Sequence, residues 1–173
     1  MKNRELKKQR YQKRMAYFKE HPRAAQTIHI LNRLFTYLVF AAYPLLLIYL
    51  LYQHNPLLAR AIIVPMNGFV LLSVIRYFIN RKRPYEAYDT EPAIKKSTKG
   101  NSFPSRHVFS VFVIAMTFLA CAPDIWYGIA LLVLGIGIAA VRVISGVHYI
   151  SDVLAAAGIA VLAGVIGFWV IPV

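Results

Sequence analysis

The stretch from 125 to 170 reads IWYGIALLVLGIGIAAVRVISGVHYISDVLAAAGIAVLAGVIGFWV. It contains two apolar runs, each close to the roughly 20 residues that a helix needs to cross a bilayer. The polar side chains of Arg142, His148 and Asp152 lie where the two runs meet. This stretch therefore predicts two membrane helices that are joined by a short turn carrying ionisable groups.

The same apolar pattern extends through most of the chain. The apolar fraction of 58% and the mean hydropathy of +0.53 exceed what soluble domains usually show. Pro44 and Pro65 fall inside apolar runs, where membrane helices tolerate kinks. We predict an all-α, polytopic membrane bundle of about five transmembrane helices, which occupies residues 27–173. The expected spans are roughly 28–52, 57–80, 104–121, 124–144 and 149–172.

The distribution of charge favours a membrane over a nucleic acid as the partner. The formal net charge is +13, but about half of the basic residues precede Ile28 and most others lie between Arg76 and Arg106. Basic clusters beside apolar runs are typical of membrane proteins. The single cysteine, Cys121, excludes both a disulfide framework and a cysteine-based metal site.

Residues 1–26 form a separate basic segment. Tyr11, Met15 and Phe18 recur at helical spacing and would give a cationic helix a narrow apolar stripe. That pattern predicts an amphipathic helix at the membrane interface. A disordered basic tail is the alternative that the same composition allows.

Ionisable side chains near the spans predict a functional site. At the centre of a span such a side chain costs about 2.5 to 3.5 kcal/mol, so each needs a partner or a polar cavity. If successive helices alternate in direction, all of these groups lie at one membrane face. They are Arg76, Arg83, Arg106, His107, Arg142, His148 and Asp152.

The spacing of these groups indicates chemistry on a phosphate. His148 and Asp152 are four residues apart, so on a helix the carboxylate can fix the imidazole tautomer and leave the other ring nitrogen free to attack. Converging guanidinium groups suit a doubly charged phosphate, and Ser105 adds a hydroxyl donor. His107 could supply the second proton-transfer group.

Each of these residues also has a purely structural explanation. The arginines alone could be a positive flank, the histidines interfacial side chains, and Asp152 an acidic residue at a helix start. If all of these explanations applied, three separate segments would each carry two or more of these residue types by coincidence. The combination therefore favours an active site.

The residues resemble the signature of the type 2 phosphatidic acid phosphatase (PAP2) superfamily. That signature consists of Lys-x6-Arg-Pro, Pro-Ser-Gly-His and Ser-Arg-x5-His-x3-Asp. The corresponding segments here are Arg76-x6-Arg83-Pro84, Pro104-Ser105-Arg106-His107 and Val141-Arg142-x5-His148-x3-Asp152. Arg76, Arg106 and Val141 depart from the usual Lys, Gly and Ser, and Arg106 either adds a phosphate ligand or indicates a more anionic headgroup.

The resemblance implies a lipid phosphate phosphatase that uses neither a metal ion nor a cofactor. By that resemblance His148 forms a phosphohistidine, Asp152 orients it, and His107 protonates the leaving alcohol. The phosphate ligands would be Arg76, Arg83, Ser105 and Arg142, with Arg106 as a possible addition. The alternatives are an undecaprenyl pyrophosphate phosphatase and, more remotely, a non-catalytic lipid-binding membrane protein.

The remaining basic residues predict the orientation in a bacterial cell membrane. The side with the site also carries the basic N-terminus, whereas the opposite loops offer only Arg60. The positive-inside rule then places the site in the cytoplasm, with a phosphorylated lipid such as phosphatidylglycerophosphate or phosphatidate as the substrate. In this interpretation the basic residues outside the site set the topology, although three of them, Lys95, Lys96 and Lys99, could instead attract anionic headgroups. The full set is Arg81, Lys82, Lys95, Lys96 and Lys99.

Overall fold

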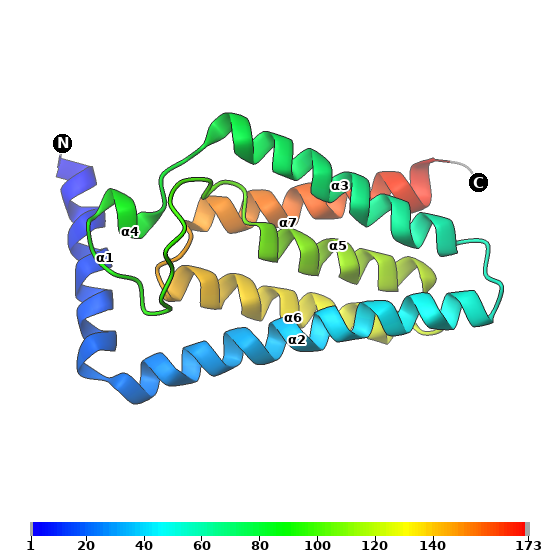
Figure 1. The fold of residues 1–173 in the computed structure, drawn as a ribbon, viewed down its shortest axis with the longest axis horizontal. Coiled ribbons are helices and arrows are strands. Elements are labelled where there is room, and N and C mark those ends of the chain that lie inside the picture. The colour runs from blue at the N-terminus through cyan, green and yellow to red at the C-terminus, as the bar shows by residue number, and fades with distance from the viewer. Residues whose placement is uncertain (1, 172–173) are drawn as a thin grey trace.

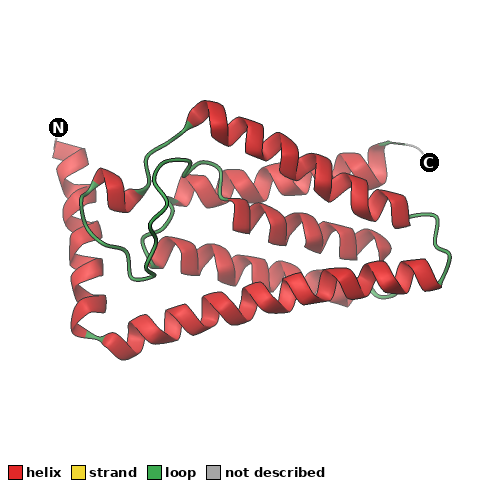
Figure 2. Cartoon of the chain, viewed as in Figure 1, coloured by secondary structure: helices red, strands yellow, loops and turns green. Residues whose placement is uncertain are grey.

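The computed structural model describes residues 2–171, which form helices and connecting loops without any strand (Figures 1 and 2). This architecture confirms the predicted all-α membrane bundle. The elements are α1 (Lys2–Glu20), α2 (Pro22–Tyr52), α3 (Leu58–Ile79), α4 (Pro84–Ala87), α5 (Arg106–Cys121), α6 (Ile125–Ile144), α7 (Ile150–Val165) and the π-helical turn η1 (Ile166–Val170).

Four helical segments within residues 2–171 have the length and apolar composition needed to cross a membrane. They are Pro22–Tyr52, Leu58–Ala87, Ile125–Ile144 and Ile150–Val170. Pro44 and Pro65 lie inside α2 and α3, so neither proline ends its helix. Large apolar side chains such as Leu45 and Leu154, each 66% exposed, cover the outside of the bundle, which suits contact with lipid chains.

The fifth apolar helix, α5, is shorter and lies at the centre of the bundle. Its 16 residues correspond to about 24 Å of helix. Most of its side chains are buried, because α3, α6 and α7 surround it (Figure 1). Gly164 of α7 allows one of these close approaches, since a Cβ there would lie 2.6 Å from the Cβ of Met116.

Helix α1 runs across one end of the bundle instead of along it (Figure 1). Its stripe of Tyr11, Met15 and Phe18 is buried, whereas the amphipathic pattern suggested contact with the membrane. These side chains pack on the start of α2 and on the tyrosines of the segment around α4. The apolar stripe therefore attaches α1 to the rest of the protein. This contact removes the apolar side chains from water, as contact with lipid would also do.

Helix α1 also holds the turn between α6 and α7. The Tyr11 hydroxyl lies 3.2 Å from the carbonyl oxygen of Gly146 and can donate to it. Gly146 has a φ of +78°, and a Cβ there would lie 2.7 Å from the Tyr11 hydroxyl oxygen. The turn that carries His148 is thus fixed from outside by a residue far away in the sequence.

Candidate active site

The polar residues predicted from the sequence gather at the end of the bundle that α1 covers. Six of the eight line one cavity of about 250 Å³. The helices α3, α5 and α6 and the α6–α7 turn each contribute at least one of them. The six are Arg76, Arg83, Arg106, His107, Arg142 and His148.

Asp152 lies behind His148 and is not itself among the lining residues. Its Oδ2 atom is 3.4 Å from Nδ1 of His148, and both side chains are buried. The same oxygen accepts hydrogen bonds from the Tyr149 backbone N–H, at 3.0 Å, and from the Ser102 hydroxyl. This arrangement directs Nδ1 of the imidazole toward the carboxylate and leaves Nε2 as the nitrogen available to a ligand.

The surroundings of His148 keep its imidazole neutral. Burial is the main cause that lowers the pKa of His148, to about 4, and the positive charges of Arg142 and Arg83 lower it further. The hydrogen bond with Asp152 acts in the opposite direction but does not cancel the effect of burial. A neutral imidazole has a free lone pair, which is what a nucleophile needs.

Three buried arginines present unused donors. Arg76, Arg83 and Arg142 are 5%, 6% and 2% exposed. Arg76 donates to the carbonyl oxygens of Pro104 and Asn101, and Nε of Arg83 donates to that of Gly100 at 3.0 Å. Each guanidinium nevertheless retains one buried nitrogen without a hydrogen-bond partner. Unpaired donors and clustered positive charges are both costly when buried, and an anion in the cavity would relieve both costs.

The loop between α4 and α5 lines the cavity, and hydrogen bonds fix its end. Gly100 donates its N–H to Oε2 of Glu86 at 2.8 Å, and the N–H of Asn101 lies 3.2 Å from Oδ1 of Asn80. Gly100 has a φ of +64°, and a Cβ there would lie 2.4 Å from the same Asn80 oxygen. The end of this loop, where Gly100 and Asn101 line the cavity, is therefore positioned by polar contacts.

Ser105 and Arg106 each differ from the buried arginines of the cavity. Ser105 is completely buried, is not among the lining residues, and its hydroxyl has no hydrogen-bond partner. It precedes α5, and its backbone N–H donates to the Asp152 carbonyl oxygen at 3.1 Å. Arg106 is exposed at the rim, with its guanidinium carbon 5.6 Å from the centre of the Phe69 ring.

Two partners of Asp152 were not predicted from the sequence. One is Arg81, for which the sequence predicted only a role in topology. It donates to Oδ1 of Asp152 at 2.8 Å, and its guanidinium carbon lies 4.0 Å from the centre of the Tyr149 ring. Ser102 binds the other carboxylate oxygen. The only sequence feature that could have indicated a role for Arg81 in the site is its position five residues after Arg76, within the first motif. No spacing in the sequence distinguishes Ser102.

Comparisons with known proteins found a matching family and similar solved structures. The family model described as PAP2 superfamily matches residues 57–173. A crystal structure of LpxE from Aquifex aeolicus is similar, with 26% identity, a TM-score of 0.67, and coverage of 85% of this chain and 86% of that chain. A search of curated proteins gave no match.

A second solved structure shares the fold at lower identity. It is described as the first transmembrane PAP2 type phosphatidylglycerolphosphate phosphatase from Bacillus subtilis. The identity is 19% and the TM-score 0.70, and the alignment covers 96% of this chain and 83% of that chain. The similarity therefore extends beyond the three short motifs to the whole arrangement of helices.

Proposed function

Because this chain belongs to the PAP2 superfamily of phosphatases, we propose that it hydrolyses a lipid phosphomonoester through a phosphohistidine at His148, without a metal ion. The observation that carries the proposal is the cavity where His148, supported by Asp152, lies beside three buried arginines with unpaired donors. Guanidinium and imidazole groups are suited to an anion. Phosphatidylglycerophosphate and phosphatidate are the candidate substrates.

In the first proposed step, Nε2 of His148 attacks phosphorus and the bond from phosphorus to the lipid oxygen breaks. His107, which lines the same cavity from α5 and acts in its protonated form, donates a proton to that oxygen, so that the lipid leaves as an alcohol. The imidazole becomes positively charged when the nitrogen–phosphorus bond forms. Asp152 stabilises this charge through Nδ1, and the arginines stabilise the charge on the phosphoryl oxygens.

In the second proposed step, water replaces His148 on phosphorus. His107, now neutral, accepts a proton from the attacking water. The nitrogen–phosphorus bond breaks, inorganic phosphate is released, and His148 returns to its neutral form. Neither step requires a change of oxidation state or a further reactant.

The choice of lipid rests on orientation and on fold similarity. Helix α1, with eight basic and two acidic residues, lies at the same end of the bundle as the cavity (Figure 1). The positive-inside rule supports a cytoplasmic position for that end, and hence a substrate in the cytoplasmic leaflet. The Bacillus subtilis protein of similar fold is a phosphatidylglycerolphosphate phosphatase, which supports the same class of substrate.

The test is phosphate release by the purified protein from a panel of lipid phosphomonoesters and pyrophosphates in EDTA. We expect activity in the chelator, a loss of roughly 10³-fold or more in His148→Ala, and a loss of roughly 10²-fold or more in His107→Ala. Quenching in alkaline detergent with a ³²P-labelled substrate should trap a phosphoenzyme that His148→Ala cannot form, because the nitrogen–phosphorus bond of phosphohistidine survives alkali but not acid. Activity that disappears in EDTA, or labelling that survives in His148→Ala, would contradict the mechanism.

A further inference from the structure

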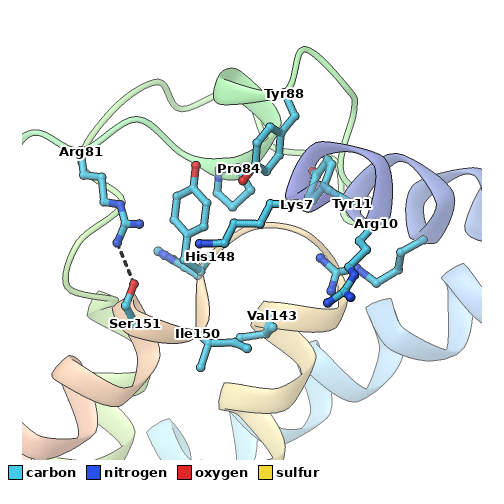
Figure 3. Close-up of a pocket in the computed structure, with 12 residues that line it drawn as sticks. Lys7, Arg10, Tyr11, Arg81, Pro84, Tyr88, Val143, His148, Ile150 and Ser151 are labelled. Atoms are coloured by element: carbon cyan, nitrogen blue, oxygen red, sulfur yellow. Dashed lines mark hydrogen bonds between the residues drawn. The ribbon is translucent and has the colours of Figure 1, made fainter. Parts of the chain in front are cut away.

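A second cavity lies on the other side of His148. Its volume is about 400 Å³, and α1 forms one of its walls. In Figure 3, Lys7 and Arg10 project from α1 over the cavity, with Val143 and Ile150 on the opposite side. His148 is the only residue that lines both this cavity and the one with the three buried arginines, within the part of the chain that the structure describes.

The charges around the second cavity are unbalanced. Lys7, Arg10 and Arg14 all line it from α1, and no described carboxylate lines it. Arg81 also lines it but is already paired with Asp152 at 2.8 Å. The three cations of α1 thus face one space without an acidic residue, and their mutual repulsion favours an anion there.

Arg14 provides a second and independent indication of an anion. Its Nε atom is buried and has no hydrogen-bond partner. The guanidinium carbon lies 5.6 Å from the centre of the Tyr11 ring, so the side chain is held against the wall of the cavity. An oxygen of a bound phosphate would satisfy the unused donor.

The position of the cavity indicates which kind of anion would bind there. Helix α1 lies across the end of the membrane bundle, where lipid headgroups are found (Figure 1). Val143 and Ile150 give the cavity an apolar side next to its cationic side, which matches the boundary between a headgroup and its chains. We propose that this cavity is a second phosphate-binding site, occupied by the headgroup phosphate of an anionic phospholipid.

The test measures lipid binding and not catalysis. Purified protein in neutral detergent is titrated with phosphatidylglycerol, with phosphatidylcholine of the same acyl chains, and with inorganic phosphate, and bound lipid is counted by native mass spectrometry. Lys7→Gln/Arg10→Gln removes two exposed cations from the cavity. Lys13→Gln/Lys19→Gln is the matched control, because it removes the same charge from the same helix at exposed positions that line none of the described cavities.

We expect phosphatidylglycerol to bind in preference to phosphatidylcholine. Its affinity should fall by roughly tenfold or more in Lys7→Gln/Arg10→Gln and change less than about twofold in the control. Equal losses in both variants would overturn the proposal, since they would indicate attraction to the whole surface. Equal binding of the two lipids, or binding of inorganic phosphate alone, would also overturn it. These outcomes do not depend on whether the protein is a phosphatase.

Discussion

At the scale of single residues, the contact between His148 and Asp152 decides the chemistry. It was predictable because the two residues are only four apart in the sequence, although His148 lies in the turn before α7 and not on the helix itself. The contacts of Asp152 with Arg81 and Ser102 span 71 and 50 residues. Such contacts depend on how helices and loops pack, so their spacing in the sequence carries no comparable signal.

The lowered pKa of His148 leads to a prediction about pH. The ordinary pKa of a histidine is about 6.5, and burial lowers that of His148 to about 4. Between pH 6.5 and pH 4, this imidazole is therefore mostly protonated in the unfolded chain and mostly neutral in the folded protein. We expect the free energy of unfolding to decrease progressively as the pH falls from 6.5 toward 4, because protonation of this group favours the unfolded chain. Above pH 6.5 this group should have no such effect.

The direct measurement is NMR of protein labelled with ¹⁵N-histidine in detergent. The chain has five histidines, and His148→Gln identifies one resonance by removing it. That resonance should titrate well below pH 6.5. A midpoint near 6.5 for His148 would show that its imidazole is not held neutral by its surroundings.

At the scale of the elements, the apolar runs predicted most ends of the membrane helices to within a few residues, but α2 begins at Pro22, six residues before the expected run of 28–52. The expected runs of 57–80 and 124–144 became Leu58–Ile79 and Ile125–Ile144. The placement of α1 was not predictable, because a short apolar stripe on a basic helix suits either a membrane surface or a protein surface. The conformation of the loop around Gly100 was equally hidden, since it depends on contacts with Asn80 and Glu86.

The α6–α7 turn provides a stability prediction at this scale. Gly146→Ala should destabilise the protein by about 1 kcal/mol or more, because φ is positive there and the added methyl group would meet Tyr11. Gly158→Ala in α7 is the matched control, since nothing lies within 4 Å of the added carbon. In that control the free energy of unfolding should increase by up to about 1 kcal/mol, because alanine has a higher helix propensity than glycine. Thermal unfolding in detergent would compare them, and equal melting temperatures would contradict the prediction.

At the scale of the whole molecule, the two ends of the chain lie at opposite ends of the bundle (Figure 1). This arrangement follows from an odd number of apolar helices running along the bundle, namely α2, α3, α5, α6 and α7. The sequence could indicate that number, because each run and each break is a local property. It could not indicate how the helices surround α5, which depends on close contacts such as that of Gly164 with Met116.

Orientation gives the prediction that belongs to the whole molecule. If the basic end faces the cytoplasm, a reporter fused after Val173 lies outside it. We expect an alkaline phosphatase fusion at that position to be active and a green fluorescent protein fusion to be dark. The same two reporters placed before Met1 should give the reverse result. A fluorescent fusion after Val173 would contradict the orientation and move the substrate to the other leaflet.

The shortness of α5 has a consequence for how a lipid reaches the protein. At about 24 Å, the helix is shorter than the roughly 30 Å hydrocarbon layer. Its far end leads to Asp124 and the exposed Trp126, which suit the opposite interface. If that end lies at the interface, the shortfall falls at the end that carries His107, and the cavity lies below the membrane surface. A bound lipid can thus keep its acyl chains in the leaflet, and this avoids a cost of about 0.8 kcal/mol for each methylene drawn into water.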